Sequence, residues 1–479
     1  MEIKKEFKIS DYLTLKLENG KTVIYVAGKH FYQCKFLLIE IPEKEGEFTF
    51  LNNLDSIDEI AEKLNTSLEP IKGRELTYNI SPETEFWGHC SNIQAWYENE
   101  YDTRLLHSNL AFPLLAELTN VGDVQAKRVL KEEIAKRFIS GFFPTMLFLV
   151  KEGYLDNLDD EETELLTKMG KIKGIGKLDL SDSKFTSLPK IIQYFISIKT
   201  LNLHGNRLTK LPETFGNLKA LESLDLGCNK LKILPDSIGK LKNLKKIDLS
   251  ENQLTAIPNS FTKLHLLEDI NLSWNNITQF PASLCDLTST KDLEISNNNL
   301  DSIPETIGNL QRLELLNLTE NNIIKIPNSI LKLLNLNWIY LGRNKIDSLP
   351  KSFGVLKRLR FINLSNNQLK SLPISIGGLE NLKTLYIGQN NLTNLPKSLG
   401  NLESLEILSL RNNSLSVIPC TISKLKNLKT LNLNSNNIKE IPKFIGGLKS
   451  LEKLYLKHNK ITFISKSISS LKSLKIFLK

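Results

Sequence analysis

Apolar and polar positions recur with a period of 23 residues from residue 175 to residue 473. The tenth copy reads L-x-x-L-x-L-x-x-N-x-L-x-x-L-P-x-x-L-G-x-L and begins at Leu382. Thirteen copies of 23 residues make 299 residues, which is the length of the segment 175–473, so the pattern repeats without insertion or deletion. A period of this length indicates a solenoid in which each repeat buries its apolar face against its neighbours.

Each copy of the repeat predicts one short strand. In the tenth copy, Leu385 and Ile387 are two residues apart, so their side chains point to the same face of an extended segment. Stacking the repeats therefore predicts an α/β fold in which thirteen parallel strands form a concave sheet with one buried face. The proline of the repeat, for example Pro396, suits an outer extended segment because it has no amide hydrogen to donate.

An asparagine follows the strand in repeats two to thirteen. Its amide has two donor hydrogens and an acceptor oxygen, which can satisfy backbone groups where each strand turns away. We expect these side chains to form a buried ladder along the array. The ladder residues are Asn206, Asn229, Asn252, Asn275, Asn298, Asn321, Asn344, Asn367, Asn390, Asn413, Asn436 and Asn459.

Residues 1–174 lack the repeat and predict a small α+β domain that also covers the first repeat. The strands are expected within residues 12–42, with a hairpin turn at Asn19-Gly20 and a further strand at residues 34–41. Helical periodicity predicts a helix at residues 55–64 and a set of helices within residues 82–169.

The first helix of that set begins with the capping residue Ser81 and with Pro82. Its apolar stripe is expected to contain Phe86, Cys90, Ile93 and Tyr97, with Trp87 and Trp96 away from the stripe. The later helices are expected at residues 110–118, 124–138, 143–151 and 159–169.

Charge divides the chain at the same boundary. Residues 1–174 contain 21 Lys and Arg against 30 Asp and Glu, a net charge of −9, and the remaining residues contain 41 against 23, a net charge of +18. The lysines of the array lie largely beside the G-x-L segment on the outer side, which indicates a solvated surface rather than a nucleic-acid site.

The composition also limits location and chemistry. The longest apolar stretch, residues 138–150, is too short and too interrupted to span a membrane, and no apolar segment of a secretory signal follows Met1. The five cysteines are scattered without the spacing of metal ligands, so we expect reduced thiols in the cytoplasm and neither a metal nor a cofactor.

One segment could carry covalent chemistry. Cys90 follows His89, and Asp102 and His107 lie near in the sequence, so an imidazole could activate the thiol. The alternative interpretation is that Cys90 is a core residue of its helix, and we expect it to be buried and unreactive. A regulatory or effector enzyme whose repeats select the substrate stays open as the alternative function.

The I-P-x-x-I-G-x-L-x-x-L phrase, as at residues 303–313, resembles the leucine-rich repeat family. The phrasing is similar to the intracellular class typified by Ras-suppressor, scribble-like and plant Ras-group-related proteins. That resemblance covers about 300 residues. It implies a non-enzymatic scaffold that binds another protein, with a small GTPase of intracellular signalling as one candidate partner. Residues 1–174 resemble no family with an assigned activity.

The strand positions beside the buried leucines are expected to face the concave side. In repeats seven to eleven these positions are rich in apolar and aromatic residues, and arginines follow two of the strands. Aromatic residues and arginines most often carry interface energy, although rings can also pack simply on each other. The candidate partner-binding residues are Trp274, Leu315, Trp338, Tyr340, Arg343, Phe361, Tyr386, Ile407 and Arg411.

The neighbouring half of the same face is acidic and could steer a partner with a basic patch. The acidic residues are Asp179, Asp225, Asp248, Glu251, Asp269, Asp292, Glu294 and Glu320. At the other end, residues 474–479 form an incomplete unit in which Ile476 and Phe477 offer the visible apolar cover. That edge predicts a small apolar plug by Phe477 or self-association.

Overall fold

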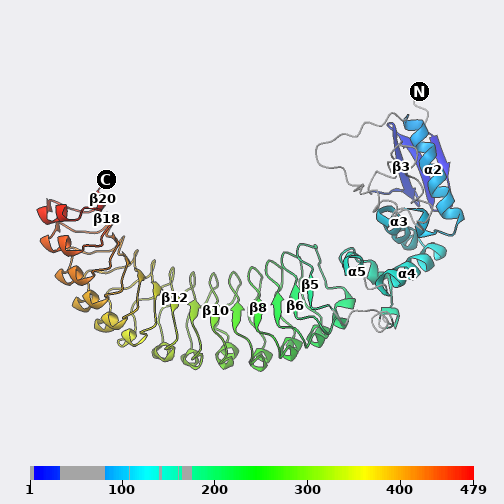
Figure 1. Ribbon diagram of the computed structural model, residues 1–479. Coiled ribbons are helices and arrows are strands. Elements are labelled where there is room, and N and C mark those ends of the chain that lie inside the picture. Colours follow the sequence, from blue (N-terminus) through cyan, green and yellow to red (C-terminus); the bar gives the residue numbers. More distant parts are fainter. Residues whose placement is uncertain are drawn as a thin grey trace, which may run out of the picture. The chain divides into compact units, whose positions relative to one another are not determined.

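The computed structural model describes residues 5–32, 81–106, 108–139, 143–159, 161–163, 165 and 175–478 (Figure 1). The chain divides into two compact units, Met1–Lys171 and Ile172–Lys479. The predicted strand at residues 34–41 and the predicted helix at residues 55–64 lie outside the described residues.

A four-stranded antiparallel sheet begins the first unit, in the order β1-β2-β3-β4. The strands are β1 (Lys5–Lys8), β2 (Leu13–Glu18), β3 (Lys21–Val26) and β4 (Lys29–His30). β2 and β3 form a hairpin whose turn residues, Asn19 and Gly20, have φ values of 50° and 72°. Such turns require positive φ, which Asn and Gly adopt most readily. The sequence did not predict β1, because Lys5–Lys8 contains a single apolar residue, Phe7.

Helices follow the sheet in the same unit. They are α2 (Pro82–Glu98), η2 (Thr103–Leu105), α3 (Ser108–Asn120), α4 (Val124–Ile139), α5 (Phe143–Lys151) and η3 (Tyr154–Asn157). Ser81 caps α2, since its side chain accepts a hydrogen bond from the backbone N–H of Thr84. Most of the helix expected at residues 159–169 lies outside the described residues. Within the part of the chain that the structure describes, no helix combines the length and apolarity needed to cross a membrane.

The buried face of α2 differs from the expected stripe. Trp96 is fully buried and packs on Tyr101 with 4.8 Å between the ring centroids, whereas Tyr97 is 38% exposed. His89 is buried as well. Adjacent helical positions are only about 100° apart, at 3.6 residues per turn. The neighbouring elements therefore determine which of residues 96 and 97 is buried. The prediction that Trp96 lies away from the stripe was wrong.

The second unit is a solenoid built on a parallel sheet of fourteen strands. Each strand is three residues long, and its middle residue points into the core. In Figure 1 the strands follow the inner side of the arc and the short helices its outer side. The strands are β5 (Lys177–Asp179), β6 (Thr200–Asn202), β7 (Ser223–Asp225), β8 (Lys246–Asp248), β9 (Asp269–Asn271), β10 (Asp292–Glu294), β11 (Leu315–Asn317), β12 (Trp338–Tyr340), β13 (Phe361–Asn363), β14 (Thr384–Tyr386), β15 (Ile407–Ser409), β16 (Thr430–Asn432), β18 (Lys453–Tyr455) and β20 (Lys475–Phe477).

The fourteenth strand, β20, corrects the expected thirteen. It pairs with β18 in a register that aligns Ile476 with the core residue Leu454, and Phe477 with Tyr455. Phe477 therefore lies on the concave row and stacks on Tyr455 with a centroid distance of 4.5 Å, rather than plugging the core. Ile476 takes the core position and stays 36% exposed.

Short 3-10 helices form the outer side of the array. They need close contact between repeats: a Cβ atom on Gly239 would lie 2.4 Å from the backbone oxygen of Ser260, so no larger residue fits without movement. A minor two-stranded sheet, β17 (Glu440–Ile441) with β19 (Phe463–Ile464), lies near the C-terminal end. The 3-10 helices are η5 (Lys190–Tyr194), η6 (Glu213–Asn217), η7 (Asp236–Lys240), η8 (Asn259–Lys263), η9 (Ala282–Asp286), η10 (Glu305–Asn309), η11 (Asn328–Lys332), η12 (Phe353–Val355), η13 (Ile374–Gly378), η14 (Lys397–Asn401), η15 (Cys420–Lys424), η16 (Lys443–Gly447) and η17 (Lys466–Ser470).

The asparagine row connects consecutive repeats. Asn344 accepts a hydrogen bond from the N–H of Ile323 in the preceding repeat at 3.0 Å, and its amide donates to the carbonyls of Leu318 and Leu341 at 2.9 and 3.1 Å. The same pattern recurs from Asn206 to Asn459, and all but the last of these side chains are buried. These side chains therefore hold the turn after each strand in place.

Candidate binding surface

Two rows of side chains project from the concave face of the sheet. They flank the buried middle residue of each strand, and the parallel register aligns them from repeat to repeat. In β11 to β15 the first row contains Leu315, Trp338, Phe361, Thr384 and Ile407, and the second row contains Asn317, Tyr340, Asn363, Tyr386 and Ser409.

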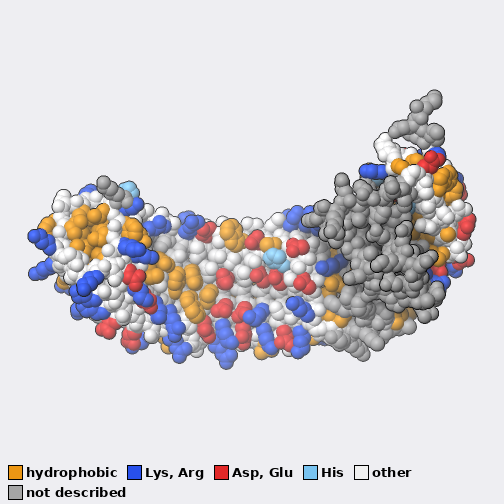
Figure 2. Space-filling model, turned by 45° about the horizontal axis from the view of Figure 1, so that its top comes forward, with side chains coloured by type: hydrophobic (Ala, Val, Ile, Leu, Met, Phe, Trp, Pro, Cys, Tyr) orange, Lys and Arg blue, Asp and Glu red, His pale blue; other side chains and the backbone are white. Residues whose placement is uncertain are grey.

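Four aromatic side chains in these rows, Trp338, Tyr340, Phe361 and Tyr386, form what we call the aromatic strip. The Tyr340 and Phe361 centroids are 4.7 Å apart, and the Phe361 and Tyr386 rings meet edge to face at 5.7 Å. Trp338 is 36% exposed. Burial raises the pKa of Tyr340, and the charge of Glu294 adds to that rise. Figure 2 shows apolar side chains gathered on the concave face beside rows of acidic ones.

Of the other candidate residues, Leu315 and Ile407 lie on β11 and β15, and Trp274, Arg343 and Arg411 lie in the turns. Trp274 and Arg343 both adopt positive φ, at 57° and 54°, just before a ladder asparagine. Trp274 is 59% exposed but belongs to repeat five, so it does not join the aromatic strip. Arg343 pairs with Glu320, and the Arg411 guanidinium donates to the Gln389 side-chain oxygen at 3.3 Å. Arg343 follows β12 of the strip, and Arg411 follows β15, the next strand after the strip.

A pocket of about 350 Å³ lies on β7 to β10, in the acidic half of the same face. Its single cation among the lining residues, Lys246, pairs with Asp269 at 2.5 Å. Burial raises the pKa of Asp292, and the carboxylates of Asp269, Glu314 and Glu294 raise it further. The pocket therefore holds uncompensated negative charge on the N-terminal side of the aromatic strip, from which β11 separates it.

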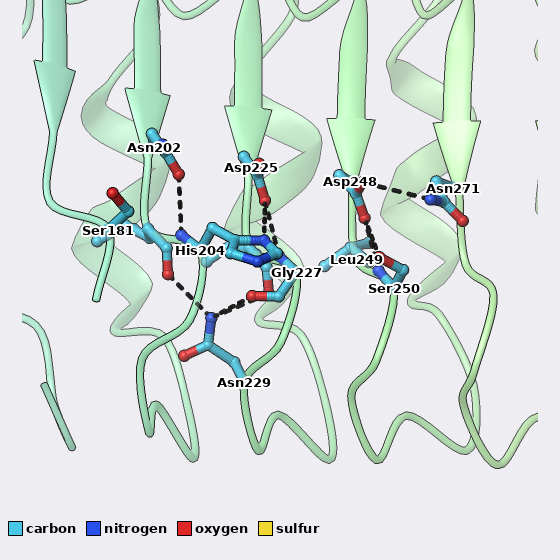
Figure 3. Close-up of polar contacts among 12 residues, drawn as sticks. Ser181, Asn202, His204, Asp225, Gly227, Asn229, Asp248, Leu249, Ser250 and Asn271 are labelled. Carbon is cyan, nitrogen blue, oxygen red and sulfur yellow. Dashed lines mark hydrogen bonds and ion pairs between the residues drawn. The ribbon is translucent and has the colours of Figure 1, made fainter. Parts of the chain in front are cut away.

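Some of these carboxylates also form hydrogen-bonded turns at the ends of their strands. Asp225 accepts a hydrogen bond from the N–H of Gly227 at 2.9 Å, and Asp248 accepts one from the N–H of Ser250 at 2.8 Å (Figure 3). The remaining oxygen of Asp248 accepts from the Asn271 amide at 3.3 Å. The sequence interpretation treated these carboxylates as steering charges alone and missed the turn that each one forms with the residue two positions later.

A second charged row precedes the strands. Lys199 and Lys245 both pair with Glu222, at 3.1 and 2.8 Å, and Lys291 pairs with Glu268 at 2.8 Å. Lysine and glutamate thus alternate between repeats. The pairing neutralises much of the positive charge on this row, which disfavours a phosphate-binding surface there.

The thiol site considered as an alternative is poorly suited to nucleophilic chemistry. Cys90 is 1% exposed, and burial raises the pKa of its thiol to about 11. The His89 imidazole is also buried and has its Nε2 atom 3.4 Å from a Glu85 carboxylate oxygen. Asp102 binds Arg104, and His107 lies outside the described residues. A nucleophilic cysteine needs a lowered pKa and access to a substrate, and Cys90 shows neither.

Family models match most of the array. The leucine-rich repeat region matches residues 178–296 and 330–416, and two further leucine-rich repeat models match residues 404–461 and 426–478, and 289–310. No curated protein matches the sequence.

Several solved structures resemble the chain. A leucine-rich repeat protein of Leptospira interrogans is 34% identical over 67% of this chain and 86% of its own, with a TM-score of 0.56. The ectodomain of the Arabidopsis receptor kinase HAESA, in complex with a peptide hormone, is 31% identical over 63% of this chain, with a TM-score of 0.51. The plant peptide hormone receptor RGFR1, in complex with RGF2, is 27% identical over 64% of this chain, with a TM-score of 0.53. The chain spans 57% of HAESA and 55% of RGFR1.

Proposed function

This chain belongs to the leucine-rich repeat family, whose fold is typical of protein–protein interaction, and we propose that it is a non-enzymatic scaffold that binds a protein partner on the concave face at repeats seven to eleven. The aromatic strip carries this proposal. It places Trp338, Tyr340, Phe361 and Tyr386 on one continuous surface of β12 to β14. Rings of this kind supply a large contact area with little loss of side-chain entropy, which is why they dominate protein interfaces.

The surroundings of the strip favour a partner with a basic patch. The acidic pocket on β7 to β10 lies on the N-terminal side of the strip, and Arg343 and Arg411 follow β12 and β15. Complementary charges of this kind accelerate association and select among partners, while the buried rings carry most of the affinity.

The class of partner follows from the resemblance to intracellular leucine-rich repeat proteins. It makes a small GTPase the first candidate to test, in intracellular signalling. The free thiols of Cys90, Cys228, Cys285 and Cys420 support a reducing compartment, so we propose a cytoplasmic location. The peptide complexes of HAESA and RGFR1 show that related solenoids hold polypeptide ligands.

A capture experiment with the full chain tests the proposal. The parent protein and the Trp338→Ala and Phe361→Ala variants are immobilised separately, and bound proteins are identified by mass spectrometry. Candidates retained by the parent and lost from both variants are then purified and titrated. We expect each substitution to weaken binding by about 2 kcal/mol, the loss typical of a central aromatic anchor.

A matched variant controls for nonspecific effects. Tyr455 occupies the same row as Tyr340 and Tyr386, but it lies in repeat thirteen. Tyr455→Ala should therefore leave the affinity unchanged. If the two strip variants bind like the parent while a variant in residues 1–170 does not, the binding site is elsewhere.

A further inference from the structure

In eight of the thirteen repeats, the last residue of the strand forms a hydrogen-bonded turn with the backbone that follows it. That residue is Asp or Asn, and its side-chain oxygen accepts a hydrogen bond from the backbone N–H two positions later. The acceptors are Asp179, Asn202, Asp225, Asp248, Asn271, Asn317, Asn363 and Asn432. The side chains that accept these bonds belong to the concave rows, so a strand that ends in another residue leaves the N–H two positions later without this acceptor.

Two repeats of the aromatic strip lack this hydrogen bond. β12 and β14 end in Tyr340 and Tyr386, and the residues two positions later are Gly342 and Gly388. Within residues 175–478, neither glycine N–H has a hydrogen-bond acceptor. Both glycines are buried, and an unpaired buried N–H is costly. The N–H groups of Ser296 and Arg411, which follow β10 and β15, likewise have no acceptor within residues 175–478. Four such donors therefore lie along this part of the array, and the two within the aromatic strip follow Tyr340 and Tyr386.

The spacing of the two donors selects a ligand conformation. Gly342 and Gly388 lie two repeats apart, and neighbouring strands are about 4.7–4.9 Å apart, so the N–H groups are separated by roughly 9.4–9.8 Å. A polyproline II segment rises about 3.1 Å per residue with three residues per turn, so its carbonyls i and i+3 point the same way about 9.3 Å apart. In a β-strand the equivalent carbonyls are about 6.6–6.8 Å apart, which does not match.

The side chains around the donors fit the same conformation. Tyr340, Phe361 and Tyr386 contact one another in sequence across β12 to β14, which forms a row of rings over the distance between the two glycines. Proline-rich segments dock on aromatic surfaces of this kind, because their backbone is already ordered before binding. The carboxylates of Asp292 and Glu294 on β10 lie two strands before β12, one further turn of such a ligand.

We propose that the aromatic strip binds a proline-rich segment of the partner in the polyproline II conformation. The segment crosses β12 to β14, its carbonyls i and i+3 accept hydrogen bonds from Gly342 and Gly388, and a lysine or arginine one turn away faces Asp292 and Glu294. This inference rests on the proposed function, since it names the chemistry that the same surface recognises.

Two matched peptide libraries test the ligand class against the full chain. The first has proline at positions i and i+3 and one arginine three residues before the first proline, with the other positions varied. The second replaces both prolines with alanine and is otherwise identical. We expect at least tenfold more binders from the proline library, and these should lose at least tenfold in affinity with Phe361→Ala.

A pair of variants tests the glycine donors separately from the ring. Tyr340→Asn and Tyr340→Leu both remove the ring and leave side chains of similar size. Only the asparagine can accept the Gly342 N–H internally, as asparagine does in five other repeats. Relative to Tyr340→Leu, we expect Tyr340→Asn to unfold at a higher denaturant concentration and to bind a fluorescein-labelled library peptide at least fivefold more weakly. Equal binding by the two variants would show that the ligand does not use this donor.

The outcomes separate this inference from the proposed function. Binders drawn equally from both libraries, yet dependent on Trp338 and Phe361, would overturn the polyproline conformation and leave the scaffold in place. The absence of any binder in the proline library would overturn the inference as well. Peptides that bind the Trp338→Ala and Phe361→Ala variants as tightly as the parent would contradict the proposal that the aromatic strip is the binding surface.

Discussion

Replacing Asn344 with alanine tests the structural role of the asparagine ladder. The substitution removes one acceptor and three donated hydrogen bonds. The carbonyls of Leu318 and Leu341 each keep a second bond from a ladder asparagine of a neighbouring repeat, and that of Gly342 keeps one from a backbone N–H. The N–H of Ile323 has no such substitute and becomes an unpaired buried donor. We therefore expect a loss of about 1–3 kcal/mol, the cost of one such group.

Urea titration followed by circular dichroism measures the loss, and hydrogen exchange locates it. The amide of Ile323 should exchange much faster in the Asn344→Ala variant, whereas amides in distant repeats should not change. Asn335→Ala is the matched control, because that amide makes an exposed bond to the Gln311 carbonyl and should cost less than about 0.5 kcal/mol. An unchanged midpoint with unchanged exchange at Ile323 would mean that water reaches these groups and that the ladder is not needed.

Three further predictions concern other parts of the chain. Cys90 should react slowly with a thiol reagent in folded protein at every pH below its raised pKa of about 11, because the thiol stays protonated. The exposed Cys420 should react first. Rapid, stoichiometric labelling of Cys90 at pH 7 would instead support the enzyme alternative. Gly239→Ala should destabilise the array by about 1–3 kcal/mol in urea titrations, since its Cβ would meet the Ser260 carbonyl oxygen at 2.4 Å; wild-type stability would show that the outer contacts are loose. Gly88→Ala should instead stabilise α2 by about 0.5–1 kcal/mol, because its new Cβ would meet no atom within 4 Å beyond its chain neighbours and the backbone of its own helix. A lower midpoint would contradict the packing of that helix face.

The repeat pattern predicted the solenoid well because each signal recurs in every copy. A 23-residue period with two leucines in alternation leaves one register for the strands, and the structure has that register from β5 to β18. The fourteenth strand escaped prediction because β20 aligns with β18 at an offset of 22 residues, outside the period. In α2, the choice between Trp96 and Tyr97 depended on packing partners that periodicity does not reveal.

The candidate surface was only partly predictable. Alternation along the strands placed the aromatic strip on the concave face, since side-chain direction in a strand depends only on position. Trp274 was grouped with the strip by residue type, yet it lies in a turn three repeats before β12. The turns formed by Asp225 and its equivalents were missed because that position also holds Glu294, Tyr340 and Ser409, so it read as variable. A hydrogen bond between positions two residues apart leaves no periodic signal of its own.

Hydrogen exchange of the full chain, alone and with a purified partner recovered by the capture experiment, tests the binding surface most directly. Binding on the concave face should protect amides in and just after β12 to β14, with Gly342 and Gly388 among them, and should leave the outer 3-10 helices η11 to η14 unchanged. Protection confined to the outer helices or to residues 1–171, with no change from residue 338 to residue 388, would contradict the account.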